Sequence, residues 1–198
     1  MVVDIDTLLA WGGCYKTLKA GDIVFREEAT CYFYYQLVSG CVKWVNIDDE
    51  GNEFIQHFVG PGNCFGELPI FDDEPYTASA IAESDSVVIY LQKPVFKELL
   101  KQRPALHFTI SKLMAQRLRY KFQLSKELAY HNPEQCIAFL LSYLKQTHQY
   151  VCDKCNKVNL TRQQIAGMTG LRVETVIRAI RSLHQKGELL IDKGKVYC

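Results

Sequence analysis

The stretch LTRQQIAGMTGLRVETVIRAIRSLHQK, residues 160–186, predicts two short helices separated by a tight turn. Thr161 followed three residues later by Gln164 has the form of a capping box, which is typical of a helix start. Gly170 suits the left-handed position after that helix, and a second helix is expected from near residue 172 to residue 186. Two short helices joined by a three- or four-residue turn containing glycine are typical of a helix-turn-helix.

A short β-hairpin is expected directly after this motif. The apolar run Leu189-Leu190-Ile191 and the pair Val196-Tyr197 flank a turn made of Lys193-Gly194-Lys195. A helix-turn-helix followed by such a hairpin is a winged helix, with the hairpin as its wing.

The second helix of a helix-turn-helix presents its N-terminal residues to the major groove of DNA. In this chain those residues are Arg172, Val173, Glu174, Thr175 and Arg178. Glu174 and Arg178 share a helix face, where arginine can bond guanine O6 and N7 and glutamate can accept from cytosine N4. The plainer alternative is a surface ion pair, worth about 0.2–0.5 kcal/mol. The other candidate DNA contacts are Thr161, Arg162, Gln163 and Lys195.

Arg172 stands where a Ser, Thr, Asp or Asn helix cap would be expected. Lacking such a cap costs about 1 kcal/mol, and the arginine charge also meets the positive end of the helix dipole. A phosphate or base contact would offset both costs. We therefore expect Arg172→Thr to weaken DNA binding while raising thermal stability.

Charge divides the chain into an acidic front and a basic rear. Residues 1–100 hold 6 Lys and Arg against 16 Asp and Glu, a net charge of −10. Residues 101–155 carry a net charge of +6 and residues 156–198 carry +5, which brings the whole chain to +1. This asymmetry indicates an anionic partner for the rear. Nucleic acid and an anionic membrane both qualify, and a solvated basic surface is the plain alternative.

Composition sets the remaining limits. The 198 residues allow one or two domains, and 48% hydrophobic with 23% charged residues is ordinary for a globular protein. No apolar run reaches 18 residues, and the N-terminus lacks the basic start of a signal peptide, so neither a transmembrane helix nor a signal peptide is expected. With the helix-turn-helix in the basic rear, DNA rather than a membrane is the expected partner. Eight cysteines are too few for a disulfide scaffold in a chain this long, which favours reduced thiols and a cytoplasmic location.

The region between residues 15 and 92 predicts short β-strands punctuated by turns. The expected strands are 32–38, 41–47, 53–58, 77–82 and 86–91. Their spacing of roughly 8–12 residues favours a sandwich or barrel. A parallel sheet would need helical crossovers, for which the chain has no room.

A long helix is expected after Pro94, because residues 94–130 contain no glycine. Its heptad stripe, expected to form a coiled-coil seam, is Leu106, Ile110, Leu113, Arg117, Tyr120 and Leu124. A second stripe, made of Met114, Leu118 and Phe122, runs beside it. Two stripes indicate two surfaces to bury, one against the chain's own β-domain and one against a partner copy. The alternative is a single wide stripe packed within one chain.

The whole chain resembles bacterial transcription regulators of the cAMP receptor protein / fumarate-nitrate regulator (CRP/FNR) family. The segments KAGDIVFREE, YYQLVSGCVKWV and GPGNCFGELPIFDDEPYTASAIA and the terminal helix-turn-helix occur in family order. The resemblance implies an α+β fold. Residues 1–100 would be a cyclic-nucleotide-binding-like jelly-roll sensor domain, 101–131 a dimerisation helix, and 132–198 a winged helix-turn-helix DNA-binding domain. Glu174 and Arg178 match the family's recognition residues.

The same resemblance implies a homodimer on a palindromic DNA site and an effector in the β-domain. Val173 is similar to the fumarate-nitrate branch, whose half-site resembles TTGAT, but Ile177 departs from the serine of that branch. RNA polymerase would be a partner if the protein is an activator. The alternative is a cyclic-nucleotide-binding module without a DNA role. An enzyme is not expected, because neither a Ser-His-Asp set nor a phosphate-cradling glycine loop is evident.

The ligand site departs from the cyclic-nucleotide-binding pattern. Its implied residues are Gly66, Glu67, Leu68, Thr77 and Ala78. Family members that bind cyclic nucleotides have an arginine for the phosphate where this chain has Thr77, and losing such a bond costs roughly 1.5–3 kcal/mol. The acidic run 72–74 would repel a phosphate further. The sequence therefore predicts that cAMP is not the effector, whose identity stays open.

The cysteines suggest several other groups. An iron–sulfur cluster needs closer N-terminal cysteines than Cys14 and Cys31, whereas Cys64 lies where haem-sensing relatives place a ligand, which leaves haem as a remote alternative. Cys152 and Cys155 form a Cys-x-x-Cys pair before the helix-turn-helix. The pair is open to three interpretations: a zinc site, a redox-active dithiol or an unligated hairpin turn. Further zinc ligands would be His148 and Cys198.

Overall fold

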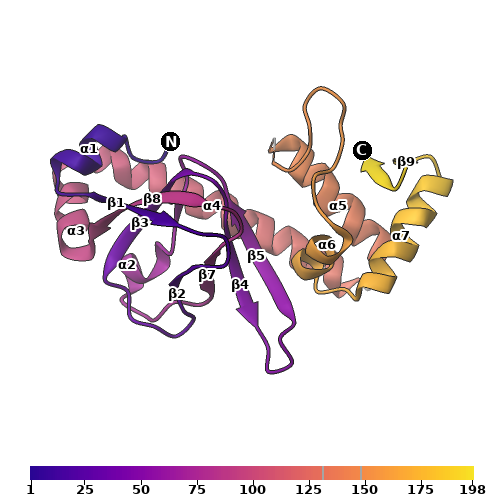
Figure 1. The fold of residues 1–198 in the computed structure, drawn as a ribbon, viewed down its shortest axis with the longest axis horizontal. Helices are drawn as coiled ribbons and strands as arrows, with labels where there is room; N and C mark the ends of the chain where they lie inside the picture. The colour runs from indigo at the N-terminus through magenta and orange to yellow at the C-terminus, as the bar shows by residue number, and fades with distance from the viewer. Residues whose placement is uncertain (131, 148) are drawn as a thin grey trace. The chain divides into compact units, whose positions relative to one another are not determined.

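The computed structural model of the chain describes residues 1–130, 132–147 and 149–198. The chain forms two compact units, Met1–Ala115 and Gln116–Cys198 (Figure 1). The division between them falls inside the long helix that the sequence analysis set apart as a segment of its own.

The N-terminal unit is built on two four-stranded antiparallel sheets. The first has the order β1 (Cys14–Leu18), β8 (Ser86–Gln92), β3 (Phe33–Ser39) and β6 (Cys64–Phe65). The second has the order β2 (Ile23–Phe25), β7 (Ser79–Ala82), β4 (Val42–Ile47) and β5 (Glu53–Val59). This arrangement confirms the jelly-roll β-domain and, with the helices below, the α+β class.

The five predicted strands are present, and the elements that the sequence analysis missed either lack an apolar alternation or are very short. Strand β1 buries only Leu18, so the alternation that identifies a half-buried strand does not appear in its sequence. Strand β2 has three residues, and helix α1 (Ile5–Ala10) has six. Elements this short carry too few apolar positions for a period to be recognised.

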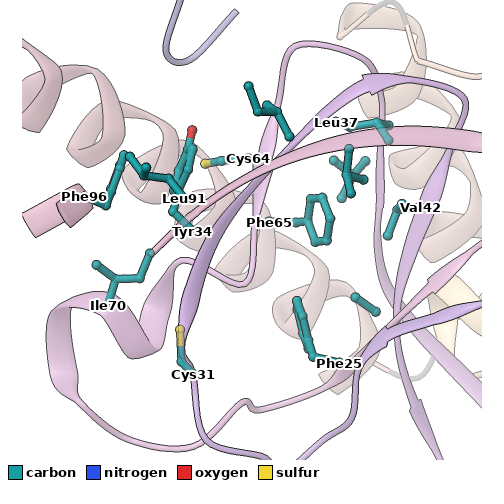
Figure 2. Packing of buried hydrophobic residues seen from close by; sticks show 14 of the residues in the cluster. Phe25, Cys31, Tyr34, Leu37, Val42, Cys64, Phe65, Ile70, Leu91 and Phe96 are labelled. Carbon is teal, nitrogen blue, oxygen red and sulfur yellow. The ribbon is translucent and has the colours of Figure 1, made fainter. Parts of the chain in front are cut away.

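The core of this unit lies between the sheets and under helices α1 and α3 (Lys93–Gln102). Tyr34 stacks on Phe96 of α3 with ring centroids 3.9 Å apart, and its hydroxyl donates to Gln36 Oε1 at 2.8 Å (Figure 2). The buried Gln36 amide also bonds the N–H and the C=O of Val3, at 2.9 and 2.8 Å. A buried polar side chain with its bonds made fixes the N-terminal segment to the roll.

Helix α4 (Pro104–Ala129) is the long helix, and it begins later than predicted. Residues 101 and 102 end α3, because Pro104 lacks an N–H and is suited to the first position of a new helix. Ile110 is 1% exposed in the core of the first unit, and Tyr120 and Leu124 are each 3% exposed in the second. The predicted coiled-coil seam is therefore wrong for these three residues, which are buried within the chain, while Leu106, Leu113 and Arg117 of the same stripe are partly exposed.

Two of the three residues of the neighbouring stripe of α4 are exposed. Leu118 is 54% and Phe122 68% exposed, and Phe108 further up the helix is 79% exposed. Met114, the third residue of that stripe, is partly buried against the core of the first unit. The helix thus has a buried side and an exposed apolar side, but neither coincides with one predicted stripe.

The C-terminal unit contains α5 (Pro133–Gln146), α6 (Arg162–Thr169), α7 (Val173–Gln185) and the hairpin of β9 (Leu190–Asp192) with β10 (Lys195–Tyr197). Isolated bridges join Val151 to Val158 and Lys157 to Tyr197, so the segment before α6 pairs with the hairpin. The core of this unit includes Ile137, Leu140, Leu144, Ile165, Val176, Ile180 and Leu183. These elements confirm the helix-turn-helix and its wing. Within the described residues, no helix is both long and apolar enough to cross a bilayer.

Candidate functional site

The start of α6 is fixed by the predicted capping box. The Thr161 hydroxyl accepts from the Gln164 N–H at 3.1 Å, and Gln164 Oε1 accepts from the Thr161 N–H at 2.8 Å. These reciprocal bonds satisfy two backbone donors that the helix leaves unpaired. Gly170 ends the helix with φ 68°, as expected for a left-handed position.

A groove of about 400 Å³ lies between the start of α6 and the turn of the wing. Thr161 and Arg162 line it from the helix, and Lys195 lines it from the wing. Lys157, which the sequence analysis did not single out, also lines the groove. Partial burial lowers the pKa of Arg162, although a guanidinium remains charged at neutral pH. Three cations beside a helix N-terminus form a surface suited to a DNA phosphate.

The start of α7 carries the residues predicted to read bases. Arg172 is the N-cap residue, and in the described structure its side chain makes no capping hydrogen bond. Glu174 and Arg178 are exposed, and the Arg178 Nε donates to the backbone carbonyl of Glu174 at 3.4 Å. Val173 and Thr175 are partly exposed, and Gln163 of α6 is exposed. The acid and the guanidinium therefore lie on the surface, four residues apart on one helix.

Helix α7 is held in place by the face opposite Glu174 and Arg178 and by its C-terminal end. Val176, Ile180 and Leu183 are buried. Lys186 forms an ion pair with Glu134 of α5. The His184 ring accepts from the Ile191 N–H of the wing at 3.3 Å. These contacts fix the orientation of the helix while its outer face stays exposed.

Arg181 is a candidate DNA contact that the sequence analysis missed. It is exposed, and it lies three residues after Arg178 and seven after Glu174, so it shares their face. The spacing was visible in the sequence, but the search covered only the first turns of the helix.

The implied ligand pocket of the β-domain has a tight backbone turn. Gly66 has φ 68°, and a Cβ at this position would lie 2.6 Å from Phe25 Cζ and 3.0 Å from Tyr76 Cε1. Glu67, which precedes helix α2 (Leu68–Asp72), is 1% exposed. The aromatic rings thus leave only enough room for a glycine.

Aromatic rings fill the space around this turn. Phe25 stacks on Tyr76 with ring centroids 3.7 Å apart, and its ring centroid lies 5.7 Å from that of Tyr35. The ring of Phe65 lies near that of Phe25, with centroids 6.0 Å apart (Figure 2). Burial raises the pKa of Tyr35 to about 12, and it raises the pKa of Tyr76 as well. Rings in such contact form a packed core region rather than an open pocket.

The other residues of the implied pocket are dispersed. Thr77 is exposed, and its carbonyl accepts from Asn46 Nδ2 at 2.8 Å, whereas Ala78 is buried and Leu68 partly exposed. Asp73, from the acidic run, bonds Lys93 Nζ at 2.7 Å and Lys97 Nζ at 3.0 Å. The expectation that this whole run repels phosphate is therefore too simple, because two lysines offset one of its charges.

Cys152 and Cys155 lie in a tight turn between the bridged residues Val151 and Val158. A hydrogen bond from Cys155 and the backbone N–H groups of Cys155 and Lys154 lower the pKa of the Cys152 thiol. Across the described residues, no three His, Cys, Asp or Glu side chains gather as metal ligands. His148 lies outside the described residues, and Cys64 is a buried residue of β6. The zinc and haem expectations thus gain no ligand set from the described residues.

Comparison with known families assigns both units. Residues 15–103 match the cyclic nucleotide-binding domain, and residues 134–197 match the Crp-like helix-turn-helix domain. A β-roll of the first kind followed by a winged helix of the second defines a DNA-binding transcription regulator, which sets aside the alternative of a module without a DNA role. The chain belongs to the CRP/FNR family of transcription regulators.

Individual relatives match almost the whole chain. It is 29% identical over 196 residues to the cAMP-activated global transcriptional regulator Vfr of Pseudomonas aeruginosa, covering 96% of this chain and 91% of Vfr. The structure of the c-di-GMP responsive regulator CLP of Xanthomonas campestris superposes with a TM-score of 0.79 at 18% identity, covering 98% of this chain and 96% of CLP. The structure of FixK2 from Bradyrhizobium japonicum superposes with a TM-score of 0.75 at 20% identity, covering 93% of this chain and 91% of FixK2. Vfr and CLP are named for different nucleotides, so family membership leaves the effector of this chain open.

Proposed function

We propose that the chain acts as a homodimer that binds an inverted-repeat DNA site, with one α7 helix in each of two successive major grooves. The observation that carries this proposal is the exposed pair Glu174 and Arg178 at the start of α7, on a helix held by its buried face. Two such helices related by a twofold axis read half-sites one DNA turn apart, about 34 Å.

The dimer would form along the exposed stripe of α4. Phe108, Ala115, Leu118 and Phe122 are all exposed, and their spacings of 7, 3 and 4 residues follow a heptad pattern. Large apolar side chains left in water are the usual mark of a protein interface. Pairing two such helices would bury these side chains and support the length of α4.

Base recognition would use three kinds of side chain. Glu174 and Arg178 would read a G·C pair and its neighbour, with each good contact worth roughly 1–3 kcal/mol of discrimination. Val173 and Ile177, both partly exposed beside this pair, would pack on thymine methyl groups. The cationic groove of Lys157, Arg162 and Lys195 would hold the backbone, so affinity would fall steeply with salt.

The effector of this regulator would be a molecule other than cAMP. The ring of Phe25 lies over Gly66, and Thr77 stands where the family arginine would hold a phosphate. Titration calorimetry of the full chain with cAMP and cGMP should show no heat of binding. Tight binding of either nucleotide would overturn this part of the proposal.

The protein would act in the cytoplasm, where it reaches DNA, and it would contact RNA polymerase if it activates transcription. This function needs neither a metal nor a haem group. Metal analysis of the purified protein tests that statement directly.

Selection of bound sequences from a random DNA pool tests the proposal. The full chain should enrich an inverted repeat with a G·C pair in each half-site. Arg178→Ala should lose the preference at that pair, whereas Lys126→Ala, a change on the exposed surface of α4, should enrich the same sequence. A pool that never enriches an inverted repeat would remove the proposed DNA recognition.

A further inference from the structure

Three cysteines converge on the base of the wing. Cys152 and Cys155 occupy one tight turn, which the Asn156 N–H closes by donating to the Cys152 carbonyl at 2.7 Å. Cys198 follows β10 directly and lines the same surface groove as Cys155. All three are free thiols, and Cys155 is exposed. A small thiol reagent can therefore reach this turn.

The two cysteines of the turn are neighbours in the backbone geometry. The bond from the Asn156 N–H to the Cys152 carbonyl closes one helix-like turn, in which residues three apart lie on one face with Cβ atoms about 5–6 Å apart. Interactions with Cys155 and with the backbone N–H groups of Cys155 and Lys154 also lower the pKa of the Cys152 thiol, which favours the reactive thiolate. Disulfide formation needs a sulfur–sulfur bond of about 2.05 Å and Cβ atoms about 3.5–4.5 Å apart, so a modest movement of the turn brings the pair to bonding distance.

The turn also supports the last strand of the wing. The Cys198 N–H donates to the Asn156 carbonyl at 3.1 Å, and the Val158 N–H donates to the Val196 carbonyl at 2.8 Å. Val196 neighbours Lys195, which lines the cationic groove. Two backbone hydrogen bonds thus link the segment around this turn to β10, the strand that also carries Lys195.

We propose that Cys152 and Cys155 form a reversible thiol–disulfide site that reacts with low-molecular-weight disulfides and controls how firmly the wing is held on DNA. The coupling to DNA rests on the function proposed above for Lys195, whereas the thiol chemistry does not.

The reaction balances with one molecule of a small disulfide RSSR. The Cys152 thiolate attacks one sulfur of RSSR, which forms a mixed disulfide and releases RS⁻. The Cys155 sulfur, having lost its proton to solvent, then attacks the Cys152 sulfur, which forms the protein disulfide and releases a second RS⁻. Each RS⁻ takes up a proton, so the pair loses two electrons and two protons and RSSR becomes two thiols.

The described residues do not complete a zinc site at this turn, and His148, another expected ligand, lies outside them. Zinc bound as a structural centre takes four ligands in most proteins, and no set of even three gathers among the described residues. The Cys198 thiol donates to the Asn156 carbonyl at 4.0 Å. A zinc ion bound stoichiometrically through Cys152 and Cys155 in the purified protein would overturn the proposal.

The first experiment counts thiols without DNA. The reduced full chain is incubated with oxidised glutathione, the free thiols are alkylated, and the modified cysteines are mapped by mass spectrometry. Wild type should lose two of its eight free thiols, at Cys152 and Cys155, and recover them with a reductant. Cys155→Ser should form no internal disulfide, whereas the matched change Cys198→Ser should behave as wild type. Unreacted thiols at 152 and 155, or a bridge to Cys198, would overturn the proposal.

The second experiment measures DNA affinity by fluorescence anisotropy, with the inverted repeat enriched from the random pool. Oxidised wild type should bind about three- to tenfold more weakly than the reduced protein, the size expected when one phosphate contact is loosened. Cys155→Ser should show no such change. Equal affinity of the two redox forms would overturn the control of the wing. Absence of DNA binding in both forms would instead contradict the proposed function, and the thiol count would still stand.

Discussion

The winged helix and the β-roll differ in where they keep the residues that would meet a ligand. In the winged helix, Glu174, Arg178 and Arg181 are exposed on the outer face of one helix whose inner face is buried. In the β-roll, the Gly66 turn lies under the ring of Phe25. One unit has its polar groups free to contact a partner, and the other has packed aromatic side chains where the family resemblance implies a pocket.

The difference shows that the helix face depends on residues close together in the sequence, whereas the pocket depends on residues far apart in the sequence. A face of α7 is set by spacings of three and four residues, so a single helix defines it. A pocket needs empty space, and a residue far along the chain can fill it, as Phe25 does for Gly66. The DNA-binding surface can therefore be retained while the effector specificity changes.

The largest expected effect concerns the surface that joins two copies. Phe122→Asp places a charge in the proposed α4 seam, where burying it without a partner is costly. We expect the variant to be a monomer by analytical ultracentrifugation and to bind the inverted repeat about a hundredfold more weakly or worse, because only one half-site is held at a time.

Gln123→Asp is the matched control. It introduces the same charge at an exposed position of α4 next to the proposed seam. It should remain a dimer and keep its DNA affinity. A dimeric Phe122→Asp would show that this stripe does not join the two copies, and the winged helices would then need another way to be paired.

The second prediction sharpens the view of the β-roll as filled. Gly66→Ala adds a Cβ that would meet Phe25 Cζ at 2.6 Å, in addition to the strain of φ 68°. Backbone strain and overpacking together should lower the free energy of unfolding by about 2–4 kcal/mol, measured by chemical denaturation.

Gly51→Ala separates the two causes. Gly51 has φ 84° in the same unit, but a Cβ there would meet nothing within 4 Å. It should lose about 1 kcal/mol from strain alone. Equal losses in the two variants would mean that the aromatic rings do not press on Gly66, and the case against a nucleotide there would weaken.

The third prediction tests whether Arg172 at the start of α7 lowers the stability of the winged helix in return for a DNA contact. Arg172→Thr supplies the missing helix cap and should raise the free energy of unfolding by about 1 kcal/mol. It should also weaken DNA binding about threefold to tenfold, since a contact from the cation to DNA is lost. Arg172→Lys keeps the charge without adding a cap, so both quantities should stay close to wild type. An Arg172→Thr variant with unchanged affinity would contradict the hypothesis that this arginine contacts DNA.

Much of the winged helix could be predicted from the sequence because its signals are local. The Thr161 and Gln164 capping box, Gly170 and the uncapped Arg172 each appear in the structure as expected. The packing of the β-roll could not be predicted, since the contact of Phe25 with Gly66 joins two strands through tertiary structure. The division of α4 into a buried and an exposed side has the same cause. Both stripes carry apolar residues, and only the fold determines which of those residues lie against the chain's own core.

The smallest expected effect concerns the acidic run beside α2, where charge in the β-roll is offset within the chain. Hydrogen bonds from Lys93 and Lys97 hold the pKa of Asp73 below its ordinary value. A lowered carboxyl pKa contributes stability at pH values above the unfolded pKa of about 3.9, and this contribution is lost as pH falls through the folded pKa. Asp73→Asn should therefore have a slightly lower melting temperature than wild type at pH 7, and the difference should begin to narrow near pH 4 and close once the pH lies below the folded pKa of Asp73.

Asparagine is the informative replacement, because Asp73 has φ 61° and asparagine tolerates this left-handed conformation. Asp72→Asn is the control, since the Asp72 side chain accepts from the backbone N–H of Glu74 and is not one of the lysine-paired carboxylates. Melting temperatures measured across pH should separate the two variants only at neutral pH. If the melting temperature of Asp73→Asn stays below that of wild type at acidic pH, the loss of stability comes from the backbone turn and not from the charge of Asp73. The two lysines would then not be what offsets this charge, and the whole acidic run would again act against a phosphate ligand.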